Sequence, residues 1–321
     1  MTENQDVDRL DKFVLDFGKL KNEISKVIVG QDQVVKEVLI SVFSGGHCLL
    51  IGVPGLAKTL LVNTVSDTLG LSFNRIQFTP DLMPSDIIGS EILDEKRQFK
   101  FIKGPIFSNL ILADEINRTP PKTQSALLEA MQEKSITNSG HSYKLDNPFF
   151  VLATQNPIEQ EGTYPLPEAQ LDRFMFNVVL DYPKYDEELK IVKQTINVSD
   201  HHNVDKVMKS EDILLYQDLI QRIPVTDNVI EYIVKLVSST RPDSSYSDSI
   251  MKDYIDWGAG PRASQYMLIA SKCHAAINGK YSPDIEDVKS IAKPILRHRL
   301  VKNYKAEAEG LSVDDIIDNL I

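Results

Sequence analysis

Cysteine and long apolar runs are scarce in this sequence. Only two of its 321 residues are cysteines, Cys48 and Cys273, and they lie far apart among apolar neighbours. A disulfide framework is therefore absent, as expected for a protein of a reducing compartment. No basic N-terminal start is followed by an apolar segment, and no apolar run reaches the length of a membrane span. These absences predict a cytoplasmic protein with no membrane span.

Positive charge is also in short supply. The chain has 35 Lys and Arg residues against 46 Asp and Glu residues, a formal net charge of −11. Because non-specific nucleic-acid binding depends on Lys and Arg at phosphates, this balance argues against such a role, although it leaves room for a local basic pore. The six histidines form no cluster with metal-ligand spacing, and His201-His202 lies in a polar stretch typical of solvated surface.

The length and composition suit two globular domains with a large core. From about 47 to 180, short apolar runs rich in β-formers alternate with helical stretches. This alternation predicts an α/β fold with a parallel sheet that helices cover on both faces. The expected strands are 47–52, 73–78, 110–114, 148–154 and 174–180, and helical spacing is expected over 1–28 and 31–42.

Two polar interruptions predict hairpins that project from the core. They cover 88–103, with a turn near Asp94–Arg97, and 135–148, with a turn at Asn138-Ser139-Gly140. After Tyr182-Pro183 an amphipathic helix begins a polar stretch, and the remainder predicts a second, all-helical domain. Its expected helices are 211–221, 226–238, 247–257, 261–278 and 284–297.

The most informative segment lies between the first expected strand and a helix. It runs Gly52-Val53-Pro54-Gly55-Leu56-Ala57-Lys58-Thr59-Leu60. Small residues let backbone N–H groups surround a phosphate, and the helix start adds its positive dipole end. Lys58 is expected to reach the β- and γ-phosphates of a nucleotide, and Thr59 to ligate Mg²⁺. Ala57 stands where this pattern usually has glycine, so closure of the loop predicts a negative φ there; the alternative is a plain Gly/Pro turn.

A second apolar run, from Leu110 to Ala113, ends in Asp114-Glu115. Ligands of parallel sheets bind beyond the carboxyl ends of the strands, so Asp114 is expected to face the Mg²⁺ at Thr59. Glu115 is expected to polarise an attacking water. Alone, such a run also describes a strand that leads into a surface loop, and its weight comes from the phosphate loop upstream.

Three further polar residues follow predicted elements. Asn156, after the next strand, is expected to orient the water beside the γ-phosphate, although Asn-Pro is also a turn signal. Arg173 ends a helical stretch and lies away from its own phosphate loop, so it either reaches a neighbouring subunit's nucleotide or caps a helix. Arg262 begins a helix, where the dipole disfavours a cation; this indicates a phosphate-binding role, with an ordinary loop arginine as the alternative.

With these residues in hand, the sequence resembles the AAA+ ATPases and, within them, the MoxR family, over roughly residues 20–300. The most specific stretches are Gly52–Thr59, in which Ala57 is typical of the family, Ala113–Gln132, Ala153–Glu161 and Leu166–Phe174. The resemblance implies an AAA+ core with two hairpin inserts over 1–185 and a helical lid over 186–321. It assigns Lys58 and Thr59 to Walker A, Asp114 and Glu115 to Walker B, Asn156 to sensor 1, Arg173 to the arginine finger, Arg262 to sensor 2, and Gly30 and Gln31 to the segment near the adenine.

The family resemblance also implies a Mg²⁺-dependent ring, usually a hexamer, that uses ATP to remodel or assemble other proteins. Some members are linked to metal-cofactor insertion, and many work with a partner that bears a von Willebrand factor A-type domain. The client and the role of Arg118, just after Walker B, stay open.

Two other functions are weighed. A nucleic-acid motor would use basic residues of the inserts in a pore, whereas the simpler interpretation is solvated hairpin charge. These residues are Lys96, Arg97, Lys100, Lys103, Lys134, His141 and Lys144. A nucleotide-gated scaffold that binds ATP without useful turnover is the third possibility, and the presence of Glu115 and Arg173 argues against it.

Overall fold

A five-stranded parallel sheet forms the centre of the molecule. The computed structural model describes residues 2–93, 95, 97–158, 162–196 and 204–321. The strand order is β2-β5-β8-β1-β9, and neighbouring strands run parallel. The strands are β1 (Cys48–Ile51), β2 (Phe73–Gln77), β5 (Leu110–Asp114), β8 (Phe150–Gln155) and β9 (Phe176–Val179). The predicted parallel sheet is confirmed, and each strand end differs from its expected position by at most two residues.

Both faces of this sheet are buried. Successive strand residues point to opposite faces, so Leu50 and Leu112 pack in one apolar cluster while Leu49 and Ile111 pack in another. The first cluster includes α1 (Thr2–Ser25), α2 (Asp32–Phe43) and α3 (Lys58–Leu69). The second includes α4 (Pro84–Ile88) and α5 (Pro121–Glu133). Double coverage explains why the strands read as nearly continuous apolar runs.

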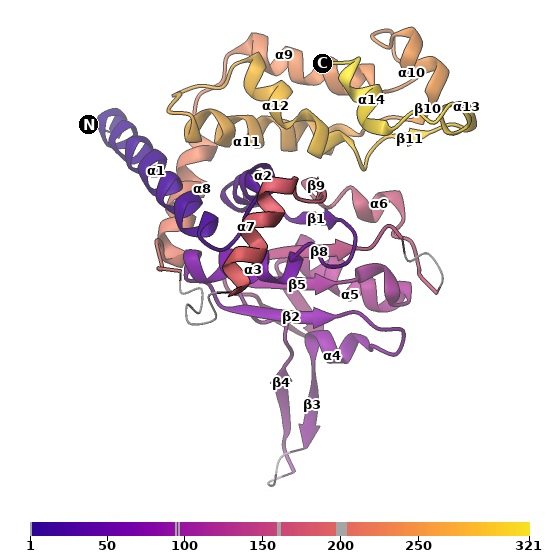
Figure 1. The fold of residues 1–321 in the computed structure, drawn as a ribbon. Helices are drawn as coiled ribbons and strands as arrows, with labels where there is room; N and C mark the ends of the chain where they lie inside the picture. Colours follow the sequence, from indigo (N-terminus) through magenta and orange to yellow (C-terminus); the bar gives the residue numbers. More distant parts are fainter. Residues whose placement is uncertain (1, 94, 96, 159–161, 197–203) are drawn as a thin grey trace.

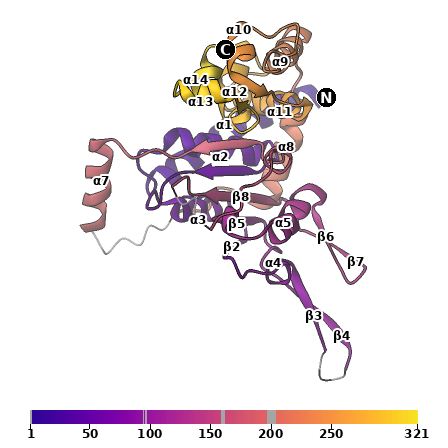
Figure 2. The same ribbon diagram turned by 90° about the vertical axis from the view of Figure 1, so that its right-hand side faces the viewer.

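Two hairpins project from the second face, as predicted. Their strands are β3 (Gly89–Leu93) with β4 (Phe99–Lys103) and β6 (Ser135–Asn138) with β7 (His141–Lys144), and Figure 2 shows both extending away from the sheet on the same side. The rings of Phe101 and Tyr143 stack with centroids 4.2 Å apart, which joins the two hairpins. Asp94 and Lys96 of the expected first turn lie outside the described residues.

The C-terminal region is helical (Figure 1), as expected. It contains α8 (Ser210–Arg222), α9 (Asp227–Ser239), α10 (Ser249–Tyr254), α11 (Pro261–Ile277), α12 (Ile285–Leu296), α13 (Tyr304–Ala308) and α14 (Val313–Asp318). The helix predicted over 247–257 is wrong at its end, since β10 (Ile255–Trp257) pairs antiparallel with β11 (Val301–Lys302). A β-branched residue and an aromatic residue favour an extended strand there.

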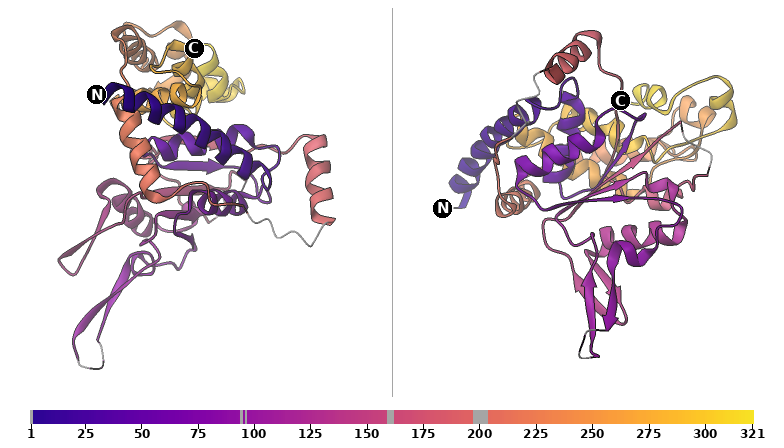
Figure 3. Two further views of the ribbon diagram at one scale, coloured as in Figure 1. Left: turned by 90° about the vertical axis from the view of Figure 1, so that its left-hand side faces the viewer. Right: turned by 60° about the horizontal axis from the view of Figure 1, so that its bottom comes forward.

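One apolar core connects the sheet to this region. Residues of α8, α9, α11 and α12 belong to the same buried cluster as α1, α2 and the first face of the sheet. The helix α7 (Tyr185–Ile196) is an exception, because it lies apart from the other helices in two views (Figures 2 and 3). Within the described residues, no helix is long and apolar enough to cross a membrane. His201 and His202 lie outside that part of the chain.

Candidate functional site

The predicted phosphate loop connects the end of β1 to the start of α3. At Gly52, a Cβ would lie 2.9 Å from the Cβ of Leu180, so only glycine fits this close approach. Gly55 has φ +87°, a left-handed conformation that glycine adopts without penalty. Ala57 has φ +55°, so the expected negative φ is wrong. A left-handed non-glycine residue is strained by about 1–3 kcal/mol, and such strain clusters at ligand sites.

Lys58 and Thr59 form the first turn of α3. In the described part of the chain no side chain caps this helix start, which leaves backbone N–H groups directed at the loop. The Lys58 ammonium group folds back over the loop and donates to the carbonyl oxygen of Gly52 at 2.5 Å. Thr59 is half-buried beside it. The helix start therefore combines backbone N–H groups, a cation and a hydroxyl, as an anionic ligand requires.

Asp114 ends β5, an interior strand of the sheet, and the residue is buried at 7% exposure. Its Oδ2 accepts hydrogen bonds from Arg75 Nε at 3.0 Å and Nη2 at 2.6 Å. Its Oδ1 accepts a bond from the Thr154 hydroxyl at 2.6 Å. A carboxylate offers about four acceptor positions, so Asp114 keeps acceptor capacity for a further ligand.

Glu115 follows Asp114 and has a left-handed backbone, φ +58°. Its Oε2 accepts hydrogen bonds from Gln77 Nε2 at 2.9 Å and Arg118 Nη1 at 3.0 Å, while its N–H donates to Thr154 Oγ1 at 2.8 Å. Glu115, which carries the second carboxylate, is therefore also the second residue of the site with a strained backbone, after Ala57. Arg118 contacts Glu115 of its own chain in this arrangement.

Asn156 lies just beyond β8 and is 6% exposed. Its Oδ1 accepts a hydrogen bond from the Ile158 N–H at 3.1 Å. Its Nδ2 is buried and has no hydrogen-bond partner within the described residues. Buried amide donors are almost always paired, so an unpaired Nδ2 at the ligand-binding edge of the sheet indicates a donor kept for a ligand.

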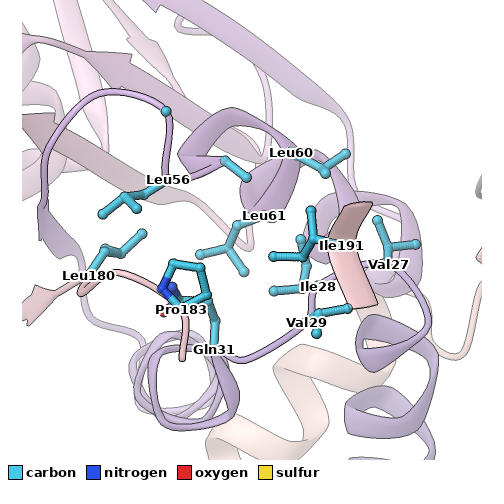
Figure 4. Close-up of a pocket in the computed structure, with 12 residues that line it drawn as sticks. Val27, Ile28, Val29, Gln31, Leu56, Leu60, Leu61, Leu180, Pro183 and Ile191 are labelled. Atoms are coloured by element: carbon cyan, nitrogen blue, oxygen red, sulfur yellow. The ribbon is translucent and has the colours of Figure 1, made fainter. Parts of the chain in front are cut away.

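An apolar pocket of about 310 Å³ adjoins the phosphate loop (Figure 4). The loop contributes Gly55, Leu56 and Ala57, and α3 contributes Leu60 and Leu61. Gln31 reaches the same pocket, and its Nε2 donates to the Asp181 carbonyl at 3.1 Å. Gly30 lies outside the lining and borders an adjacent pocket. An apolar wall with a few polar groups is what a flat heterocycle beside a phosphate site needs.

Arg173 and Arg262 lie together on the opposite edge of the sheet. Arg173 precedes β9, which runs parallel to β1, so it lies where the strands begin, whereas the phosphate loop lies where they end. Arg262 Nη1 donates to Asp172 Oδ2 at 3.0 Å. Both arginines line a pocket of about 170 Å³ together with Lys134, and no residue of the phosphate loop borders it. The structure therefore brings the loop, Asp114, Glu115 and Asn156 to one edge and the two arginines to the other.

Sequence reasoning did not assign three contacts of the acidic pair. Thr154, Arg75 and Gln77 hold Asp114 and Glu115. The register of the sheet, with Ala113 opposite Ala153 and Gln77 opposite Asp114, places all three beside these carboxylates. These contacts depend on which strands are neighbours in the sheet, and a single sequence does not show the strand order.

Comparisons with known proteins agree with this architecture. Residues 47–176 match the model described as the "ATPase family associated with various cellular activities (AAA)", and residues 247–320 match the AAA lid domain. The crystal structure of a protein from Cytophaga hutchinsonii assigned as an ATPase is similar with a TM-score of 0.91 and 46% identity, covering 98% of this chain and 95% of that one. The fold and site thus define an AAA ATPase.

Curated relatives narrow the family. The chain is 42% identical over 300 residues to chaperone MoxR1 of Mycobacterium tuberculosis, covering 93% of this chain and 79% of that protein. It is 40% identical over 305 residues to the uncharacterized protein YeaC of Bacillus subtilis, covering 95% and 92%. The chain belongs to the MoxR family of AAA ATPases.

Proposed function

We propose that this protein hydrolyses ATP in a ring of identical subunits and uses the energy to remodel client proteins. One observation supports the proposal: the residues expected to bind and hydrolyse ATP lie at opposite ends of the parallel strands. The phosphate loop and acidic pair lie where the strands end, and Arg173 and Arg262 lie where they begin. A complete site therefore needs a second copy, and such head-to-tail contacts close into rings.

Several residues would bind the nucleotide. The loop N–H groups and Lys58 hold the phosphates, and the apolar pocket beside Gln31 holds the adenine. The oxygen donors of Thr59 and Asp114 suit Mg²⁺, a hard cation that prefers hydroxyl and carboxylate ligands, and Asp114 retains acceptor capacity. When bound, the ion would neutralise charge on the phosphate oxygens.

The remaining roles concern the attacking water. Glu115 polarises the water, and the unpaired Nδ2 of Asn156 donates to the water or to the γ-phosphate. Arg173 of the neighbouring subunit neutralises charge in the transition state. Asp172 holds Arg262 beside Arg173. Arg262 therefore acts, like Arg173, on the nucleotide of the adjoining subunit rather than on the nucleotide of its own subunit.

The projecting hairpins support a protein client. Leu93 and Phe99 pair across β3 and β4 and are 60% and 75% exposed. Exposed apolar side chains on a projecting element favour protein contacts over the phosphate contacts that a nucleic-acid motor needs. The related MoxR1 is named a chaperone. The proposal includes a partner protein with a von Willebrand factor A-type domain and a role in metal-cofactor insertion. It also divides the chain into a core over 1–185 and a lid over 186–321.

Light scattering with Glu115→Gln, with and without ATP-Mg²⁺, tests the ring. This substitution keeps ATP bound by blocking turnover. A nucleotide-dependent particle the size of a hexamer would support the proposal and place Arg173 at an interface. A monomer under both conditions, together with ATPase activity of the original protein that is independent of protein concentration, would contradict it.

A further inference from the structure

Arg299 is a buried arginine that follows α12 and is 7% exposed. Its Nε donates to Asp172 Oδ1 at 2.7 Å. Its Nη2 donates to the carbonyl oxygens of Asp172 at 2.9 Å and Phe174 at 2.7 Å. Its Nη1 donates to the carbonyl of Met175 at 3.3 Å and also to that of Ile295. A guanidinium group with this many acceptors is held in one orientation.

The segment Asp172–Met175 carries Arg173 and lies between the core and the lid. Its backbone N–H groups donate to carbonyls of the core, and the Arg173 Nη1 donates to the Leu128 carbonyl at 2.7 Å, whereas the carbonyls of the segment accept from lid side chains. Tyr266, on α11, donates its hydroxyl to the Arg173 carbonyl at 3.1 Å. Together with the Arg299 bonds, this gives each of the four successive carbonyls of the segment a donor from the region that matches the AAA lid model. The ring of Tyr266 also lies 5.2 Å from the Arg299 guanidinium. The carbonyl groups on either side of Arg173 are therefore held by the lid, so a movement of the lid changes the position of this segment relative to the core.

The same contacts connect Arg299 to Arg262, the half-buried arginine that lines a pocket together with Arg173. Asp172 accepts hydrogen bonds from Arg299 on Oδ1 and from Arg262 on Oδ2, so one carboxylate, directly before Arg173 in the chain, bridges the two guanidinium groups. Burial lowers the pKa of Arg299, although the charge and hydrogen bond of Asp172 act to raise it. A buried charge is tolerated only when it is paired and fully hydrogen-bonded, and packing alone would not require arginine here.

We propose that Arg299 is a positioning residue for Arg173: it transmits the orientation of the lid to the arginine that reaches the neighbouring subunit's ATP. This inference rests on the proposed function, in which Arg173 acts across an interface. It goes further by connecting the lid to the neighbour's chemistry. A movement of Arg299 with the lid shifts Asp172 and Arg173 together, and a misplacement of about 1 Å can cost roughly 100-fold in rate.

The first test is Arg299→Lys, which keeps the charge but replaces the five-donor fork by a single ammonium group. We expect kcat for ATP to fall roughly 10- to 100-fold, with KM for ATP changed less than about 2-fold, because the phosphate loop lies on the other edge of the sheet. Arg297→Lys is the matched control. Arg297 also ties the lid to the sheet, through the Asn177 carbonyl at 2.7 Å, and it pairs with Asp314 within the lid. Within the described residues, none of its hydrogen bonds is with Asp172–Met175. Its kcat is expected to stay near that of the original protein.

Mixed rings separate positioning from a general loss of structure. Glu115→Gln subunits have an inactive site of their own but a correctly placed Arg173. Arg299→Lys subunits have an intact phosphate loop and Glu115 but a misplaced Arg173. Mixing the two is expected to give more turnover than the sum of each alone. The reference mixture pairs Arg173→Ala with Glu115→Gln. If the reference recovers activity and the Arg299→Lys mixture does not, the positioning role is overturned; if the reference itself fails, the proposed interface role of Arg173 is what fails.

A milder variant covers the case in which Arg299→Lys does not fold, as judged by circular dichroism and thermal unfolding. Tyr266→Phe removes only the hydroxyl that donates to the Arg173 carbonyl. We expect a several-fold loss of kcat that is recovered by mixing with Glu115→Gln. Full turnover of Tyr266→Phe in that case would overturn the inference.

Discussion

The hydroxyl of Thr154 donates a hydrogen bond to Asp114 Oδ1 at 2.6 Å. The Thr154 Oγ1 also accepts a hydrogen bond from the backbone N–H of Glu115 at 2.8 Å. Thr154 is fully buried, and its strand pairs with that of Asp114. One hydroxyl thus contacts both acidic residues of the site, since it donates to the Asp114 carboxylate and accepts from the Glu115 backbone N–H.

Replacing Thr154 by valine removes both bonds without changing the shape of the side chain. The Glu115 N–H and one Asp114 oxygen then lose a partner, which costs about 1–3 kcal/mol per buried group. We expect a lower free energy of unfolding by this order in urea titrations, and a larger loss in kcat than in ATP affinity. Thr154→Ser keeps the hydroxyl and is the control. Equal turnover of the valine and serine variants would contradict the role.

The left-handed backbone of Ala57 predicts an unusual tolerance for glycine. Ala57→Gly relieves about 1–2 kcal/mol of steric strain and loses about 0.5–1 kcal/mol through added chain entropy in the unfolded state. We therefore expect the free energy of unfolding to stay within about 1 kcal/mol of the original, with nucleotide binding retained. Ala57→Val should be destabilised, because a β-branched residue fits this conformation poorly. Equal stability of the valine and glycine variants would contradict the observed φ.

Much of this molecule could be predicted from its sequence, because its strands are buried on both faces and read as short apolar runs between helices. The hairpins were also predictable, from polar runs around turn residues. The sequence could not show that Ala57 has a positive φ, since local sterics favour the opposite and only the closed loop imposes it. It likewise could not pair Arg299 with Asp172, which lie 127 positions apart, because that contact depends on how the lid packs against the sheet.

Substitutions of Lys58 and Arg173 should affect ATP binding and ATP turnover separately, since the two residues lie at opposite ends of the parallel strands. Lys58→Ala removes the cation of the phosphate loop, and we expect ATP affinity itself to fall. Arg173→Ala leaves that loop intact, so ATP binding should persist while turnover falls steeply; arginine fingers contribute about 10³- to 10⁵-fold in rate. Fluorescent-nucleotide titrations and phosphate-release assays on the same preparations distinguish the two. Unchanged affinity in Lys58→Ala, or full turnover in Arg173→Ala, would contradict the assignments.

Buried histidine predicts how stability depends on pH. His47 precedes β1; its Nδ1 accepts the Val151 N–H at 3.0 Å and its Nε2 lies 3.2 Å from the Met131 carbonyl. Burial lowers the pKa of His47 to about 4, whereas the unfolded chain has a value of about 6.5. Below about pH 6.5 the unfolded state therefore binds a proton at His47 that the folded state does not bind.

The free energy of unfolding should then fall as the pH falls, by about 2 kcal/mol between pH 7 and pH 5 from His47 alone. Burial also lowers the pKa of His274 and His298, so their contributions have the same sign. Urea titrations at pH 7, 6 and 5 measure the slope. His47→Gln cannot titrate, so its slope should be shallower by about one proton, even if its stability at pH 7 is lower. Equal slopes for His47→Gln and the original protein would show that His47 does not exclude a proton in the folded state.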